Sequence, residues 1–67
     1  MMQQIYTRTQ LNRILYGLIG SWELVDVWWN SNNKAFAGKA PNEVYWSGES
    51  GRQEVANYIL KNAEYNI

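Results

Sequence analysis

Apolar residues recur at helical spacing in the first third of the chain. Between Thr9 and Gly20, Leu11 is followed 3, 4, 7 and 8 residues later by Ile14, Leu15, Leu18 and Ile19. This spacing places them on one face of an amphipathic helix. Thr7 or Thr9 is a suitable N-cap, and Gly20 is a suitable residue to end the helix. The pattern therefore predicts a first helix that ends near Gly20.

A second helix is predicted directly after the first, over 22–30. Ser21 is a good N-cap, and Glu23 lies in the first turn, where the helix dipole favours a carboxylate. Glu23 and Asp26 fall on one side, and apolar side chains spread over the rest, at Trp22, Leu24, Val25, Val27, Trp28 and Trp29. An ordinary surface helix has an apolar stripe only roughly 100° wide. This helix is therefore expected to be central in a small bundle, or to be covered on a second side by a partner.

Asparagine, glycine and proline punctuate the middle of the chain. The stretch "NSNNK" at 30–34 is typical of a turn, because asparagine and serine side chains compete for backbone hydrogen bonds. Asn33 is expected to close this turn or to cap the residues after it, and Gly38 permits a special backbone angle. Pro41 suits the first turn of a third helix, over 41–46.

A last helix is predicted from Gly51 to about Ala63, with Ser50 as its N-cap. Its buried stripe is expected to consist of Val55, Tyr58, Ile59 and Leu60. No segment shows the alternation that is typical of a strand. We therefore expect an all-α fold, a small bundle of about four short helices. These form one domain over 1–67, with a loose N-terminus at 1–6 and a tail at 64–67.

The composition excludes several classes of function. The chain has 67 residues with no Cys and no His, which excludes disulfides, zinc sites with His or Cys ligands, and His-dependent catalysis. We therefore expect no enzyme activity, no metal and no cofactor. Six basic residues balance six acids, whereas nucleic-acid binders of this size usually carry a basic excess. No apolar run approaches the ~20 residues of a membrane span, and the start lacks a signal peptide, so a cytoplasmic protein without nucleic acid or membrane partners is expected.

Aromatic residues make up 15% of the chain, and tryptophan and tyrosine dominate them. Such side chains suit small cores and also surfaces that become buried on association. Trp28 is expected to fill the core, because one tryptophan can anchor a small domain. Trp29, one position further round the helix, cannot point the same way, so it is the tryptophan singled out for a partner contact, with packing left open as the alternative. For Trp22 and Trp46, which flank loops, packing and partner contact both stay open.

The spacing of several residues resembles that of a known family. Tryptophan, asparagine, phenylalanine, glycine, proline and glycine follow one another as Trp28, Asn33, Phe36, Gly38, Pro41 and Gly51. This arrangement is similar to the C-terminal toxin-binding domain of the MbcA/ParS/Xre antitoxin family, and the resemblance covers Leu11 to Leu60. The chain departs from the family at Trp29 and Asn42, where leucine is usual. Too few residues precede Ser21 for the helix-turn-helix domain that many members carry.

The resemblance implies a protein-binding module whose partner is a RES-type toxin. In the family this domain docks on a toxin that consumes NAD or transfers from it, and its C-terminal segment blocks the toxin's active-site entrance. Carried over, the last helix and tail would be the blocking element. Arg52 is added because a cation near the start of a helix is unfavourable there, which makes it a candidate for a salt bridge or for a partner contact. The expected partner-binding residues are therefore Trp22, Trp29, Trp46, Arg52, Tyr58, Lys61, Glu64, Tyr65 and Ile67.

Two other assignments stay open. A module of this size also suits a bacteriophage or mobile element, where it would inhibit a host enzyme or a defence complex. A different class is a small self-associating structural protein, such as a subunit of a phage particle or scaffold. In that case the wide apolar arc of the second helix would pack against copies of itself. A concentration-independent homo-oligomer would favour the structural protein, and a monomer or weak dimer would favour a different partner.

Overall fold

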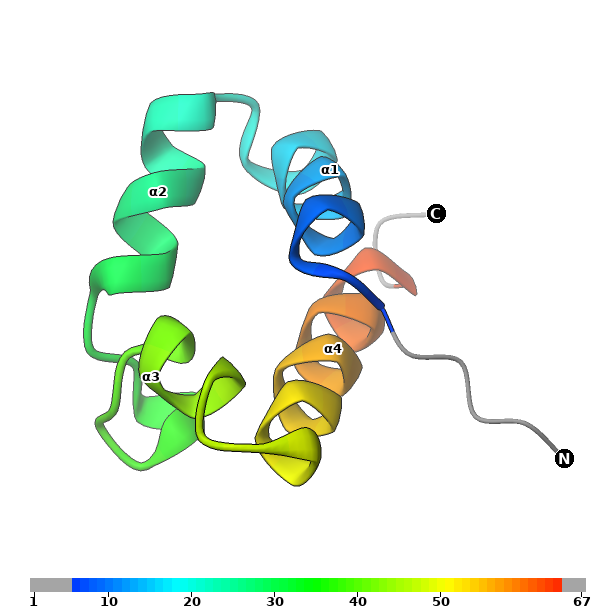
Figure 1. Cartoon of the computed structure of the whole chain (residues 1–67). Helices are drawn as coiled ribbons and strands as arrows, with labels where there is room; N and C mark the ends of the chain where they lie inside the picture. The colour runs from blue at the N-terminus through cyan, green and yellow to red at the C-terminus, as the bar shows by residue number, and fades with distance from the viewer. Residues whose placement is uncertain (1–5, 65–67) are drawn as a thin grey trace, which may run out of the picture.

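Helices account for most of the computed structural model, which describes residues 6–64 and, for Glu64, the backbone only. The elements are α1 (Arg8–Ile19), α2 (Trp22–Asn30), the short 3₁₀ turn η1 (Lys34–Phe36), α3 (Pro41–Tyr45) and α4 (Glu49–Glu64) (Figure 1). Within these residues there is no strand, and the only strand-like pairing is the isolated bridge between Asn33 and Lys39. The all-α prediction is confirmed.

The first two helices begin and end at the residues that the sequence predicts. Thr7 and Gln10 form a capping box on α1, in which each side chain accepts the other residue's backbone N–H at 3.1 and 2.9 Å. Gly20 ends α1 with a φ of 86°, in the left-handed region that glycine adopts without a steric penalty. One residue later, the Ser21 hydroxyl accepts the N–H of Leu24 and caps α2.

The capping box allows a direct test of the start of α1. We expect Thr7→Ala to lower the free energy of unfolding by about 1 kcal/mol, because the N–H of Gln10 loses its acceptor. Thr9→Ala is the matched control, since Thr9 lies exposed within α1 and alanine is the better helix former there. Urea unfolding of both variants gives the two values. A larger loss for Thr9→Ala would contradict this cap.

The turn between α2 and α3 folds around Asn33. Its side chain accepts the N–H of Ala35 at 2.9 Å, and its carbonyl accepts the N–H groups of Phe36 and Gly38. Gly38 has a φ of 82°, which explains the glycine. Pro41 follows as the first residue of α3 and is buried. The structural roles predicted for Asn33, Gly38 and Pro41 are thereby confirmed.

The last helix begins earlier than predicted. It starts at Glu49, so Ser50 lies inside it and is not its N-cap. The N–H of Arg52 donates to the carbonyl of Gly48 at 3.0 Å, and Gly48 has a φ of 146°. Glycine reaches this backbone conformation and serine does not. The turn before α4 is therefore made by the backbone of Gly48. Rules that identify an N-cap from its side chain do not predict such a turn.

The four helices pack in a ring around one core. The main contacts join α1 to α2, α2 to α3, α3 to α4, and α4 back to α1 (Figure 1). Each helix contributes to the buried apolar cluster, which consists of Leu11, Leu15, Val25, Trp29, Phe36, Val44, Tyr45, Val55, Ala56 and Ile59. Tyr6, part of the segment expected to be loose, packs against this cluster, and its carbonyl accepts the Tyr45 hydroxyl at 3.4 Å. Residues 1–5 lie outside the described residues.

Candidate functional site

Polar and aromatic side chains gather along the line where α1 meets α2 and α3. On α1, Arg8, Asn12 and Tyr16 recur every four residues and therefore share one face of the helix. They contact residues of α2 and α3 through the hydrogen bonds and ring contacts described below. We call this line the seam, and it consists of Arg8, Asn12, Tyr16, Trp22, Trp29, Asn30, Asn42 and Trp46.

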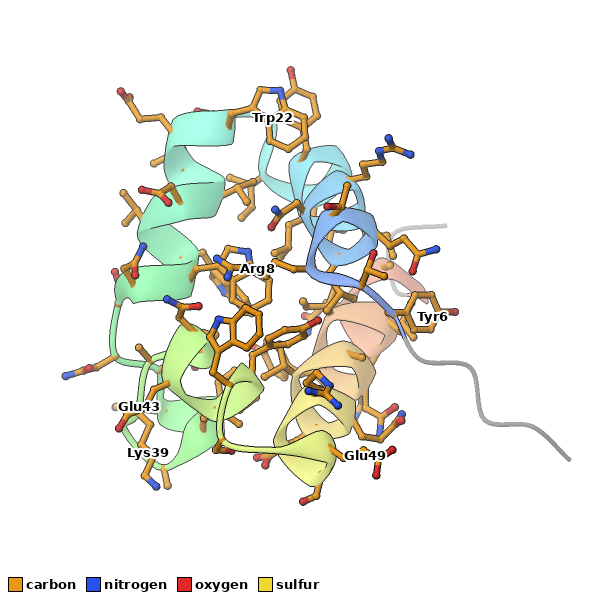
Figure 2. All side chains as sticks on the ribbon, in the orientation of Figure 1. Tyr6, Arg8, Trp22, Lys39, Glu43 and Glu49 are labelled. Carbon is orange, nitrogen blue, oxygen red and sulfur yellow. The ribbon has the colours of Figure 1, made fainter. Side chains whose placement is uncertain are left out.

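One end of the seam is an aromatic stack. The rings of Tyr16 and Trp22 lie 4.4 Å apart between centroids, at an interplanar angle of 26°. Trp22 is the first residue of α2 and stands at the corner between the two helices (Figure 2). It is 57% exposed, although its ring already rests on a neighbour. The stack therefore holds a large apolar surface in place while leaving most of it to solvent.

The middle of the seam is fixed by Trp29. Its indole N–H donates to the Asn12 side-chain oxygen at 2.6 Å. The guanidinium of Arg8 lies over its ring, 3.8 Å from the centroid, which is a cation–π contact. Arg8 reaches this position from the start of α1, across the space between α1 and α2 (Figure 2). Trp29 itself is only 1% exposed, so it lies in the core and packs beneath the exposed residues of the seam.

The other end of the seam converges on Asn42, the second residue of α3. Its side-chain oxygen accepts from Arg8 Nη1 at 2.9 Å and from the indole N–H of Trp46 at 3.0 Å. Its amide nitrogen donates to the Asn30 side-chain oxygen at 3.4 Å. Trp46 is 64% exposed, and its ring packs edge-on against Tyr45. Asn42 thus joins α1, α2 and α3 and holds Trp46 in one orientation.

Arg8 is the seam's only formal charge, and no carboxylate of the described residues is paired with it. Desolvation lowers the pKa of its guanidinium below the ordinary value, and Tyr45 and Asp26 act in the opposite direction. The group nevertheless stays protonated at any pH at which proteins fold. Its Nε is buried without a hydrogen-bond acceptor. Among the described residues, the seam therefore presents a half-buried positive charge with no carboxylate paired to it, and Asp26 acts on it only from a distance.

The structure reverses the roles predicted for the two adjacent tryptophans. Trp29, expected to face a partner, is fully buried, and Trp28, expected to fill the core, is only half-buried at its edge. Trp28 meets Trp29 edge-on at 5.2 Å and stacks on Tyr58 at 6.3 Å. The reason is that α1 supplies both an acceptor for the Trp29 N–H and a cation for its ring. The prediction that Trp29 is a partner-binding residue is therefore wrong for the folded chain.

The other residues predicted to contact a partner occupy several faces. Trp22 and Trp46 lie in the seam and are exposed. On α4, Arg52 and Tyr58 are half-buried and Lys61 is exposed. The side chain of Glu64 and the residues Tyr65 and Ile67 lie outside the described residues. The structure thus brings Trp22 and Trp46 onto one line with Arg8, and it does not bring Arg52, Tyr58 or Lys61 to that line.

Sequence reasoning missed Arg8, Asn12, Tyr16 and Asn42. The four-residue spacing of the first three on α1 is a signal that could have found them, because it marks a second, polar face beside the apolar stripe. Asn42 has no such spacing, although it is one of the two positions at which the chain departs from the family pattern. Its role depends on side chains 34 and 12 residues away in the sequence.

Among the described residues, the hollows outside the seam include the following two. One, of about 200 Å³, is lined by apolar residues of α1, α2 and α4 and by Asn62. The other, of about 400 Å³, lies between η1, α3 and α4 and includes Lys39, Glu43 and Glu54. Both glutamates are exposed, whereas carboxylates that act as general acids are commonly buried. Over residues 6–64, no group of three or more His, Cys, Asp or Glu side chains is placed to hold a metal ion.

Comparison with known proteins gave no match to any family model, curated protein or solved structure. Over the part of the chain that the structure describes, none of the helices has both the length and the apolar character needed to cross a membrane.

Proposed function

We propose that this chain is a protein-binding module without catalytic activity of its own, and that it docks on its partner through the seam. The observation that carries the proposal is that Trp22 and Trp46, at the two ends of the seam, are 57% and 64% exposed. Tryptophan and arginine are the residues most enriched among binding hot spots. The seam offers two exposed tryptophans with an arginine between them.

The two tryptophans are also held in place before any partner arrives. Trp46 is fixed by its hydrogen bond to Asn42, and Trp22 by its stack on Tyr16. Ordering a flexible side chain at an interface costs about 0.5–1.5 kcal/mol. Because these side chains are already ordered, most of that cost falls on folding and not on binding. Exposed tryptophans that are already ordered therefore support a role in partner binding better than they support incidental exposure to solvent.

Inhibition by occlusion is the mechanism we propose for the bound state. It comes from the resemblance to the MbcA/ParS/Xre antitoxins, in which the last helix and tail cover the active-site entrance of a RES-type toxin. In this chain α4 contributes Tyr58 and Lys61 to that step, with Glu64, Tyr65 and Ile67 following. Docking through the seam leaves α4 and the residues after it available to reach a neighbouring site.

Affinity capture tests the docking surface. A chain tagged at its N-terminus is used to capture proteins from the lysate of its source cells, with Trp22→Ala/Trp46→Ala as the variant. We expect the wild-type chain to retain a partner and the double variant to lose it, because truncation removes both exposed aromatic rings. The matched control is Leu24→Ser/Val27→Ser, which removes two exposed apolar side chains from α2 outside the seam.

The same experiment separates docking from occlusion. If the captured protein is an enzyme, removing residues 63–67 should restore its activity while capture persists. A partner that stays bound to the tryptophan double variant, or that is lost only with the Leu24/Val27 control, would contradict docking through the seam.

Self-association is the second candidate, and a specific observation favours it. Leu24 and Val27, one helical turn apart on α2, are 51% and 53% exposed. They match the expectation that the wide apolar arc of this helix packs against another copy. In that case the Leu24→Ser/Val27→Ser variant is monomeric by light scattering at a concentration where the wild-type chain is oligomeric.

A further inference from the structure

We infer that the seam recognises an acidic segment of the partner, with a carboxylate on the Arg8 guanidinium and an adjoining apolar side chain on the Trp46 ring. The inference rests on the proposed function and names the chemistry of the partner. Its starting point is that Arg8 carries five N–H donors, of which the described residues accept one, Nη1 to Asn42 at 2.9 Å. Nε is buried without an acceptor, and no carboxylate is paired with the group.

A partner carboxylate would meet a guanidinium that is already oriented. The Trp29 ring lies against one face of the group and Asn42 holds one corner. Arginine and carboxylate pair through short, charge-assisted hydrogen bonds that are stronger than those between neutral groups. Burial has already removed part of the water around the Arg8 guanidinium. A partner carboxylate therefore has little water left to displace from it. A paired carboxylate, which the described residues do not provide, is therefore the feature that a partner supplies.

Trp46 fixes where the rest of the segment lies. Arg8 and Trp46 donate to the same oxygen of Asn42, so the guanidinium and the indole are neighbours. A residue beside the partner's carboxylate consequently falls on the exposed indole face. A leucine or another large apolar side chain suits that face, because binding hot spots are enriched in tryptophans that pack against the partner.

Asp26 limits the approach from the α2 side. It is exposed and close enough to act on the pKa of Arg8, although the two are not paired. An acidic segment therefore lies on the Asn42 and Trp46 side of the guanidinium, away from Asp26. Removing the Asp26 charge should strengthen binding of an acidic segment, which gives the inference a variant that improves affinity.

A nucleic-acid phosphate is the other anion that an arginine beside a tryptophan can bind. The chain's basic and acidic residues are equal in number, whereas phosphate backbones are bound through several cations together. The seam has one cation, and the carboxylate that acts on its pKa, Asp26, would repel a phosphate. These observations favour a protein carboxylate, and inorganic phosphate becomes a comparison in the test.

The test is a titration of the isotope-labelled chain followed by nitrogen–proton correlation spectra. The probe is the peptide acetyl-Leu-Glu-Leu-Glu-Leu-amide, with its glutamine analogue and inorganic phosphate as comparisons. The reporters are the indole N–H of Trp46, assigned from a Trp46→Phe variant, and the Nε–H of Arg8, which burial protects from exchange with water. We expect saturable shifts of both signals with the acidic peptide and binding about tenfold weaker with its glutamine analogue.

Variants make the result specific to this site. Asp26→Asn should tighten binding of the acidic peptide, and Trp46→Ala and Arg8→Gln should each weaken it. Trp46→Ala keeps the test valid if Arg8→Gln fails to fold, because Trp46 is largely exposed. Equal binding of the glutamine analogue or of phosphate, no saturable shift, or an unchanged affinity in Trp46→Ala would each overturn the inference. The two proposals can fail separately. If capture depends on Trp22 and Trp46 but the peptide titration fails, the seam remains the docking surface and the acidic segment is rejected.

Discussion

We expect Trp29→Ala to abolish the cooperative folding of this domain. Trp29 is 1% exposed and contacts Trp28, Tyr45 and the Arg8 guanidinium. Truncating a buried tryptophan costs about 3–5 kcal/mol. A single core of this size rarely supplies more than about 3–5 kcal/mol of net stability, so the loss is comparable to the whole. Alanine also leaves Asn12 and Arg8 without the partners that the indole provides.

Far-ultraviolet circular dichroism with thermal unfolding measures this effect. Trp46→Ala is the matched control, because the same truncation at a residue that is 64% exposed should change the free energy of unfolding by less than about 1 kcal/mol. The contrast between the two variants is the informative quantity. A Trp29→Ala chain that still unfolds cooperatively, close to the wild-type midpoint, would show that Trp29 does not belong to the core.

Gly51→Ala is the second change with a large expected effect. Gly51 lies in the first turn of α4 and is buried where this helix crosses α3. A Cβ atom there would overlap the carbonyl oxygen of Val44 and come within 2.5 Å of the Ser47 hydroxyl oxygen. The Val44 carbonyl belongs to the backbone and already accepts hydrogen bonds from Ser47, so it cannot move aside. We expect a loss of about 1–3 kcal/mol, as for other overpacked sites.

Gly17→Ala is the control that separates crowding from helix propensity. Gly17 lies inside α1, and apart from its chain neighbours and the backbone of its own helix, no heavy atom lies within 4 Å of the Cβ position. Alanine is the better helix former by about 0.5–1 kcal/mol, so this variant should be more stable than the wild-type chain. Urea unfolding of both variants gives the comparison. A Gly51→Ala chain that gains stability as Gly17→Ala does would contradict the close approach of α3 and α4.

Local signals were sufficient for most of the fold. The cap at Ser21, the break at Gly20 and the proline that opens α3 were all predicted, and Thr7 was one of the two caps proposed for α1, because each acts on residues within one turn of itself. The start of α4 was not, since a glycine backbone and not a side chain makes that turn.

The seam could be predicted only in part, for a different reason. Both Trp28 and Trp29 satisfy the same local pattern, and the choice between them depends on Asn12, which lies 17 residues earlier. Likewise Arg8 meets Asn42 across 34 residues. Exposed tryptophans at Trp22 and Trp46 were within reach of sequence reasoning, because both flank turns. Their connection through Arg8 and Asn42 was not, since it requires the helices to be placed in space.

The ring of helices bears on how the chain folds during synthesis. Leu11 and Leu15 of α1 belong to the same buried cluster as Val55 and Ile59 of α4, and α1 packs on α4. A nascent chain that has emerged only as far as α3 therefore lacks the part of this cluster that covers the leucines from the α4 side. Domains fold as units as they leave the ribosome, and this unit is complete only when α4 has emerged. We therefore expect part of the apolar face of α1 to stay uncovered until synthesis of α4 is complete.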